Sequence, residues 1–215
     1  MKDTNDSTEE VVSNLLSGLQ VTDDEDIDKP QEPKSPQHTL ICDAGYAFPR
    51  EARPRKEKVN AIARQLANFL EWQMKRYKGK ISTMAYIKVV GCQDENIVSL
   101  LKDRTKQLLN KGELPNHVTF ESRSLTDSCS ASGLKNNPIY LSPDAQDTLD
   151  PSQRPPDVCV VGLLIDRRVQ PNRSKERALK LEMLSKRWPL EQCFSDIDPN
   201  EPLNVDCVLE GMQQW

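Results

Sequence analysis

The segment Val158–Asp166, VCVVGLLID, decides the fold class of this chain. Eight consecutive residues carry no polar side chain, and the run ends in a carboxylate. Such a run is typical of a strand buried on both faces, as in the centre of a parallel sheet. In open α/β sheets, ligands bind beyond the carboxyl ends of these strands. The pattern therefore predicts a parallel sheet with Asp166 at its ligand-binding edge.

The rest of the chain from residue 38 alternates short apolar bursts with segments of helical period, which is typical of an α/β domain. The predicted strands are 39–43, 84–90, 117–121 and 138–141. The predicted helices are 57–77, 96–111, 172–184 and 203–215. The segment 122–137 is rich in Ser, Asn and Gly without periodicity, and it is predicted to be a loop.

The net charge of −4 hides an uneven distribution. The first 36 residues hold ten Asp or Glu and three Lys, a net of −7, which leaves 26 basic and 23 acidic residues, a net of +3, for the remainder. The acidic part has too little apolar surface to offset the entropy of ordering. We expect residues 1–37 to form a solvated acidic tail and residues 38–215 to form one α/β domain.

Several function classes find no support in the sequence. No apolar run approaches the ~18 residues of a membrane span, and the start lacks the character of a signal or transit peptide. The six cysteines are widely spaced and the only histidines are His38 and His117, so no metal site is expected. The glycine-rich dinucleotide and P-loop signatures, GxSxG and HExxH are all absent.

Two basic blocks stand out. Residues 50–80 have a net charge of +7 and residues 166–187 have a net charge of +5. Together with Trp72, Tyr77 and Trp188, they match a surface that tracks phosphates and stacks on bases. The simpler alternative, solvated helix faces without a ligand, stays open on composition alone.

Five segments in order resemble one protein family. IYLSPDAQDTLD at 139–150 and CVVGLLIDRRVQP at 159–171 are similar to the paired signature of the SPOUT-class methyltransferases that modify N1 of the purine at tRNA position nine. LICDAGY at 40–46, RALKLEMLSKRWPLEQCF at 177–194 and PLNVDCVLEGMQQW at 202–215 resemble the family's opening, loop and closing elements. The VQP ending is most similar to the mitochondrial branch, which includes the methyltransferase subunit of protein-only ribonuclease P.

The resemblance implies a monomeric SPOUT-type parallel sheet with helices on both faces and a C-terminal trefoil knot, a rare exception to unknotted topology. It also implies that S-adenosylmethionine binds in the knot loops. The residues that correspond to the family's cofactor contacts are Leu141, Ser142, Val161, Gly162, Leu184, Trp188, Leu190, Leu203, Asn204 and Val205. Gly162 is expected to let the ligand approach the backbone, because it has no Cβ.

Asp166 matches the family's proposed general base. N1 of guanine carries a proton that must leave as the methyl group arrives, whereas N1 of adenine carries none. A plain strand-end carboxylate is the alternative for this residue. The basic residues expected to contact tRNA or precursor tRNA are Arg53, Arg55, Lys56, Lys58, Arg167, Arg168, Arg173 and Lys175.

The branch resemblance implies a short-chain dehydrogenase-like subunit and a protein-only ribonuclease as further partners, and a mitochondrial location, with nucleus or cytoplasm as the alternative. Trp188 departs from the family's loop, and the acidic start replaces a lysine-rich arm. The family continues beyond the position of Trp215, so a truncated or divergent form is expected. A non-catalytic tRNA-binding scaffold of a ribonuclease P-like complex is the alternative function, and a module that binds neither ligand is a third.

Overall fold

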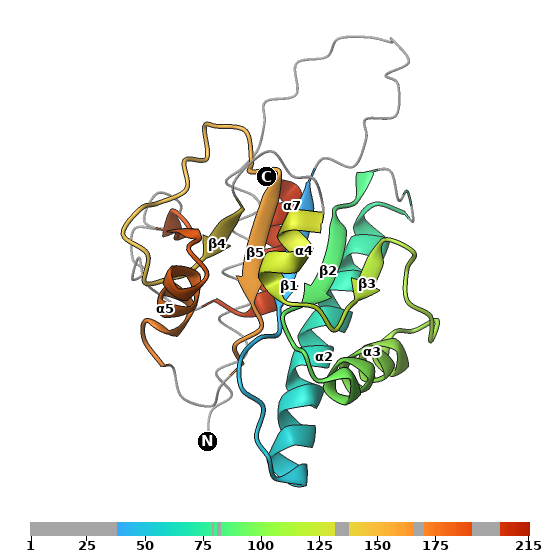
Figure 1. The fold of residues 1–215 in the computed structure, drawn as a ribbon. Coiled ribbons are helices and arrows are strands. Elements are labelled where there is room, and N and C mark those ends of the chain that lie inside the picture. The colour runs from blue at the N-terminus through green and yellow to red at the C-terminus, as the bar shows by residue number, and fades with distance from the viewer. Residues whose placement is uncertain (1–37, 79, 81–82, 132–137, 166–169, 191–202) are drawn as a thin grey trace, which may run out of the picture.

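The structure is a computed structural model, and it describes residues 38–78, 80, 83–131, 138–165, 170–190 and 203–215. The predicted tail, residues 1–37, lies outside these. The described chain forms one parallel sheet of six strands in the order β3-β2-β1-β5-β4-β6 (Figure 1). The strands are β1 (Thr39–Asp43), β2 (Tyr86–Val90), β3 (Val118–Phe120), β4 (Ile139–Leu141), β5 (Val158–Gly162) and β6 (Leu184–Lys186).

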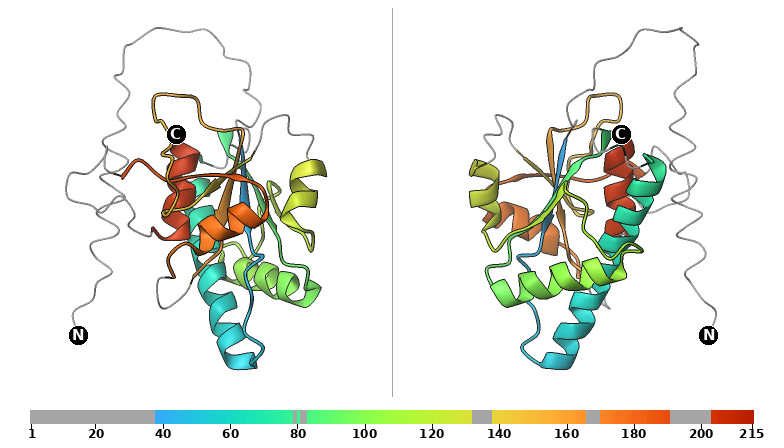
Figure 2. Two further views of the ribbon diagram at one scale, coloured as in Figure 1. Left: turned by 60° about the vertical axis from the view of Figure 1, so that its left-hand side comes forward. Right: turned by 90° about the vertical axis from the view of Figure 1, so that its right-hand side faces the viewer.

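The central strands β1 and β5 are buried on both faces, which explains the apolar residues 40–42 of β1 and the unbroken apolar sequence of β5. Leu40 and Cys42 of β1 belong to a core that the sheet shares with α2 (Ala52–Arg76), α3 (Glu95–Leu108) and α7 (Val205–Gln214). Ile41 points to the opposite face, towards α4 (Leu125–Ala131) and α5 (Arg173–Lys180). Figure 2 shows these two helical layers with the sheet between them. The predicted α/β sheet with helices on both faces is therefore confirmed.

One predicted helix start and one predicted loop are wrong for identifiable reasons. α2 begins at Ala52, five residues before the predicted start. Pro54 does not prevent this earlier start, because it lies in the first turn, where backbone N–H groups have no partner within the helix. The predicted loop 122–137 contains the helix α4. The Ser124 hydroxyl accepts the backbone N–H of Asp127 and donates to its carboxylate, as in a capping box, and Leu125 is buried.

The predicted strand 158–166 ends at Gly162, and the predicted final helix begins at Val205. The trefoil knot depends on how residues 166–169 and 191–202 run, and these lie outside the described residues. The knot stays a prediction. Within the described ranges, no helix has the length and apolarity needed to cross a membrane.

Candidate active site

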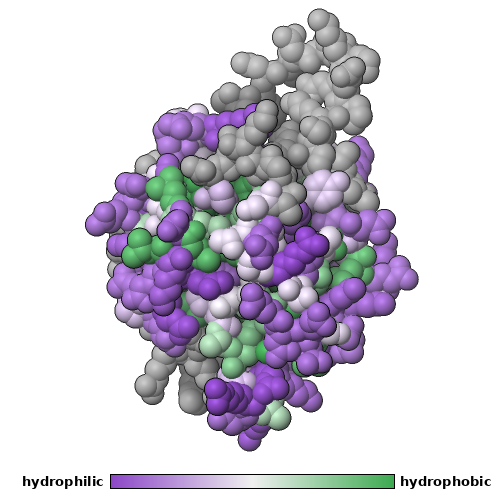
Figure 3. All heavy atoms as spheres, viewed as in Figure 1, coloured by the Kyte–Doolittle hydropathy of each residue, from purple (hydrophilic) through white to green (hydrophobic). Residues whose placement is uncertain are grey.

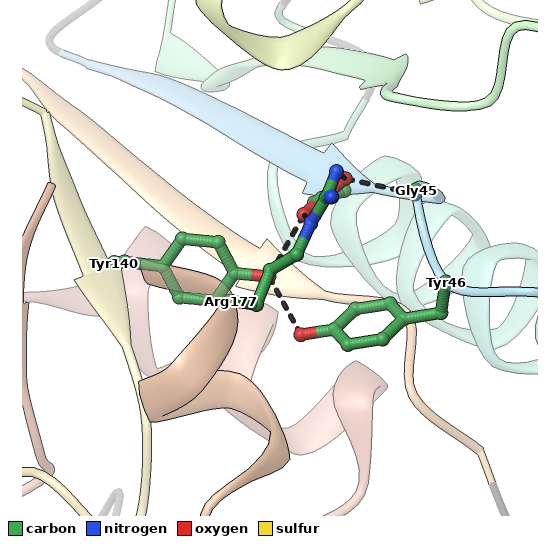
Figure 4. Close-up of polar contacts among 5 residues, drawn as sticks. Gly45, Tyr46, Tyr140 and Arg177 are labelled. Carbon is green, nitrogen blue, oxygen red and sulfur yellow. Dashed lines mark hydrogen bonds and ion pairs between the residues drawn. The ribbon is translucent and has the colours of Figure 1, made fainter. Parts of the chain in front are cut away.

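A buried ion pair lies at the carboxyl end of the sheet, where β1 ends. The Asp43 carboxylate is fully buried and receives Arg177 of α5 at two points, from Nε to Oδ2 at 2.9 Å and from Nη2 to Oδ1 at 3.1 Å. The backbone N–H of Gly45 donates to Oδ1 at 2.8 Å, and the Tyr140 hydroxyl donates to Oδ2 at 2.9 Å. Figure 4 shows these residues with Tyr46, and we call the five the Asp43 cluster.

The two tyrosines extend the cluster as a chain of donors. The hydroxyls of Tyr46 and Tyr140 are 2.7 Å apart. The single hydroxyl proton of Tyr140 is used on Asp43, so Tyr46 donates to Tyr140. Burial raises the pKa of Tyr46 to about 12 and also raises the pKa of Tyr140, whose phenolate the nearby Asp43 charge would further disfavour. Both tyrosines therefore stay protonated and act as donors near neutral pH.

Arg177 is fixed from several sides. Its hydrogen bonds to Asp43 raise its pKa above the ordinary value of arginine. Its guanidinium lies 5.9 Å from the centre of the Tyr46 ring, and Arg173 lies 5.8 Å from the same ring. With four donors on two oxygens and a permanent cation beside it, the Asp43 carboxylate is a structural acceptor rather than a proton acceptor for chemistry.

The absence of a side chain at Gly162 leaves room for the tyrosines of this cluster. Gly162 pairs with Asp43 across β1 and β5, and a Cβ added to it would meet the Tyr46 hydroxyl at 2.6 Å and the Tyr140 hydroxyl at 3.0 Å. The space that a side chain at position 162 would need is filled by these two tyrosines. The absence of a Cβ therefore lets both tyrosines approach the backbone, and the expected cofactor contact of Gly162 stays a prediction.

Two other predicted cofactor residues lie on the opposite face of the sheet. Leu141 and Val161 are paired in β4 and β5, are buried, and face the core shared with α7. The backbone N–H of Ser142 donates to the carbonyl of Lys186 at 3.0 Å, so the end of β4 adjoins the segment that follows β6. The Ser142 hydroxyl is bonded to the Ser174 hydroxyl of α5 at 2.8 Å.

Trp188 leaves β6 and lies against α7. A Cβ added to Gly211 would lie 3.1 Å from a Trp188 ring carbon, and the rings of Trp188 and Trp215 have centres 5.8 Å apart. The Trp188 Nε1–H is buried without a hydrogen-bond partner among the described residues. We call Leu141, Val161, Trp188, Gly211 and Trp215 the α7-side region.

The remaining predicted cofactor residues differ in position. Leu190 and Val205 are buried, and the backbone N–H of Val205 donates to Gln65 of α2 at 2.9 Å. Leu203 is half-buried, and Asn204 is the exposed residue that precedes α7. Leu184 is not brought to this group: it is half exposed at the start of β6 and pairs with Ile139.

A pocket of about 340 Å³ lies beside this region, between the β4–β5 connection and the end of α7. Its walls include Ile139, Leu149, Arg154, Lys186 and Trp215. None of the predicted cofactor residues lines it. Among the described residues, no three His, Cys, Asp or Glu side chains are grouped as metal ligands.

The predicted RNA-binding residues fall into two groups. Lys56 is exposed, and Arg53 is exposed in an i,i+4 pair with Glu57. Arg55 and Lys58 instead hold the β1–α2 connection: Arg55 donates to the carbonyls of Pro49 and Arg50, and Lys58 donates to Ala47 at 3.1 Å. For Arg55 and Lys58, the structure gives a fold-stabilising role that the sequence did not predict.

In the second basic block, Arg173 and Lys175 are half-buried on α5, while Asp166, Arg167 and Arg168 lie outside the described residues. Arg173 donates to Gln170 at 2.6 Å. The first turns of α2 project beyond the carboxyl end of β1, and α5 lies at the same end of the sheet (Figure 1). Figure 3 shows hydrophilic side chains over this end of the molecule. The beginning of the first basic block and the α5 part of the second therefore lie at the same end of the sheet.

Sequence analysis missed the Asp43 cluster as a site. The signal was present, because Asp43 ends a buried apolar strand just as Asp166 follows one, and the same rule about strand ends applies to both. Arg177 carried no such signal, since only the fold brings α5 over β1.

Comparisons with known proteins agree with this architecture. No protein-family model and no curated protein matches the chain. Among solved structures, the crystal structure of spTrm10(74) has a TM-score of 0.61 and 14% sequence identity, with 88% of this chain and 92% of that one covered. The spTrm10(Full length)-SAH complex has a TM-score of 0.55 and 14% identity, with 85% and 89% covered. The chain therefore has the fold seen in these two Trm10 crystal structures.

Proposed function

We propose that this protein is an S-adenosylmethionine-dependent tRNA methyltransferase that acts on N1 of the purine, guanine or adenine, at tRNA position nine. The observation that carries the proposal is the Trm10 fold over 88% of the chain, in a sequence whose five motif-like segments occur in the family's order. One of the similar structures is a complex with SAH, the demethylated form of this methyl donor.

We assign the proposed cofactor to the α7-side region because of two features. Leu141 and Val161 are buried apolar residues of the kind found around adenine rings, and the Trp188 Nε1–H is a buried donor without a hydrogen-bond partner among the described residues. Leu190 and Val205 extend the apolar surface, and the loop after β4 would hold the polar end. S-adenosylmethionine supplies the methyl group when it is bound there.

The proton of guanine N1 requires an acceptor. Asp43 is unsuited, because its oxygens are saturated by Arg177, Tyr140 and Gly45. We assign this role to Asp166, which follows β5 in the sequence. Ligands of open α/β sheets bind beyond the carboxyl ends of such strands. The Asp166 carboxylate would accept the N1 proton as the methyl group arrives.

The beginning of the first basic block and the α5 part of the second lie at the same end of the sheet and would provide the surface for tRNA. Lys56 and Arg53 on α2 and Lys175 on α5 are the described residues best placed to contact phosphates. The finer assignments, namely the trefoil knot, the mitochondrial branch, a mitochondrial location, and a complex with a dehydrogenase-like subunit and a ribonuclease, belong to the same proposal and rest on the sequence resemblance.

The test has two parts. Calorimetric titration with S-adenosylmethionine, with and without unmodified tRNA, measures cofactor binding, and a methyl-transfer assay followed by nucleoside analysis locates the product. We expect binding, methylation at position nine, and loss of guanine methylation in Asp166→Asn. An unchanged rate in that variant would remove Asp166 as the base. Binding of tRNA without any binding of S-adenosylmethionine would instead establish the scaffold function.

A further inference from the structure

Arg177 connects α5 to the carboxyl end of β1 and is the side chain on which the Asp43 cluster depends. It comes from a different element, 134 residues away in sequence, and three-quarters of its side chain is covered. Two parallel N–H donors on one carboxylate fix the orientation of both partners, which a single-point ion pair does not do.

Asp43 also holds the backbone that leaves β5. Its carbonyl accepts the N–H of Leu163 at 2.9 Å, while its side chain binds Arg177. At the other end of the β5–α5 connection, the N–H of Asn172 donates to Asp144 at 2.7 Å, and Ser174 of α5 is bonded to Ser142. Both described ends of this connection are therefore fixed to the ends of β1 and β4.

We propose that Arg177 is a positioning residue for methyl transfer: its two-point pair with Asp43 holds α5 against β1 and thereby sets the positions of Leu163 and Asn172, which flank the segment that carries the proposed base. This inference rests on the proposed function. Arg177 itself touches neither methyl donor nor base in this account. A displacement of about 1 Å at a reacting group can reduce a rate roughly 100-fold, so a loosened α5 is expected to lower the rate constant more than the affinity.

The decisive variant is Arg177→Lys, which keeps the charge and loses the two-point geometry. With saturating tRNA and S-adenosylmethionine, we expect the single-turnover rate constant to fall roughly 10- to 100-fold, while the dissociation constants of both ligands change less than about threefold. Arg104→Lys on α3, where the native arginine donates to Gln107 within its own helix, is the matched control and should leave all three values unchanged.

The double variant Asp43→Asn/Arg177→Gln removes both charges together, so no unpaired buried charge remains. It should reproduce the slow transfer. An unchanged rate constant in Arg177→Lys, or a fall that only parallels weaker tRNA binding, would overturn the proposal.

Hydrogen exchange separates this inference from the proposed function. In Arg177→Lys the backbone amides of Leu163 and Asn172 should exchange faster than in the native protein, while the amide of Ile87 in β2, bonded to His117, should keep its rate. If the native protein methylates no tRNA, the proposed function fails, whatever the exchange shows. Unchanged exchange at Leu163 and Asn172 would show that Arg177 does not hold the connection.

Discussion

The Asp43 cluster and the α7-side region lie on opposite faces of the same sheet edge, and they treat polar groups in opposite ways. In the cluster, both carboxylate oxygens have donors, and glycines at 45 and 162 leave room for the side chains that supply or support them. In the α7-side region, apolar side chains surround an indole N–H that has no partner among the described residues. On one face, both oxygens of the buried carboxylate have hydrogen-bond donors. On the other face, a buried N–H donor has no acceptor among the described residues.

This difference suggests that the two faces of the sheet have different roles. A buried polar network with every member bonded gives rigidity and a single arrangement. A buried donor without a partner costs free energy, about 1–3 kcal/mol, unless a ligand satisfies it. The first face is thus suited to hold the backbone around the site, and the second is suited to receive the proposed cofactor. The following predictions test that contrast, beginning with the largest effect.

Removing the arginine should have the largest effect on stability. Arg177→Met leaves the fully buried Asp43 carboxylate without its cation, and breaking such a pair costs about 3–5 kcal/mol of the free energy of unfolding. Urea denaturation followed by circular dichroism measures the change. Arg104→Met, on α3, serves as the control with an expected loss below about 1 kcal/mol. A loss of similar size in both variants would mean that the cluster is not a special source of stability.

Gly162→Ala should disrupt the cluster from the other side. The new Cβ would lie 2.6 Å from the Tyr46 hydroxyl, and forced overpacking of this kind costs about 1–3 kcal/mol. The second substitution Tyr46→Phe removes the nearest of the atoms in conflict, and the Tyr140 hydroxyl at 3.0 Å remains. The double variant should therefore be more stable than the sum of the two single losses predicts, which a double-mutant cycle measures. Strict additivity would show that Gly162 is needed for another reason.

The sequence predicted the strands and helices around this site better than the side-chain contacts within it. The apolar run that begins at Val158 identified a central strand, because a strand buried on both faces leaves an unbroken pattern, and the short segment 39–43 was correctly predicted to be a strand. The helix period of Val59, Ile62, Leu66 and Phe69 identified α2. Those patterns depend on local neighbours, so a single sequence carries them.

The contacts that the sequence missed depend on tertiary placement. Arg55 and Lys58 looked like phosphate ligands, yet the turn after β1 brings backbone carbonyls to both of them. Arg177 looked like one more basic residue of an exposed helix, and only the crossing of α5 over β1 turns it into a buried partner. α4 was missed although Ser124 and Asp127 have the spacing of a capping box.

A smaller, pH-dependent effect is expected on the α7 side. Burial and the nearby Asp206 raise the pKa of Glu210 to about 7, above its ordinary value of 4.5. The folded state therefore binds this proton more tightly than the unfolded chain, and its contribution to stability is lost as the pH rises from about 4.5 to about 7. Because Glu210 is only half-buried, solvent screening reduces the effect, and Glu210→Gln should add about 1 kcal/mol at pH 8 and close to nothing at pH 4. An equal gain at both pH values would assign the effect to packing instead.

The smallest effect on stability is expected for Gly211→Ala, which tests whether the Trp188 ring is placed for a ligand. Alanine favours a helix over glycine by about 1 kcal/mol, but here its Cβ would lie 3.1 Å from the Trp188 ring, so the two contributions largely offset each other. We expect a change below about 1 kcal/mol in the free energy of unfolding.

The indole of Trp188 should nevertheless move in Gly211→Ala and alter the tryptophan fluorescence. If the ring borders the proposed cofactor, S-adenosylmethionine should bind several-fold more weakly to Gly211→Ala, whereas unchanged affinity would separate Trp188 from the cofactor. Gly112→Ala, in the turn after α3, is a control for cofactor affinity only, because an added Cβ has no neighbour within 4 Å there but the φ of +62° makes alanine strained.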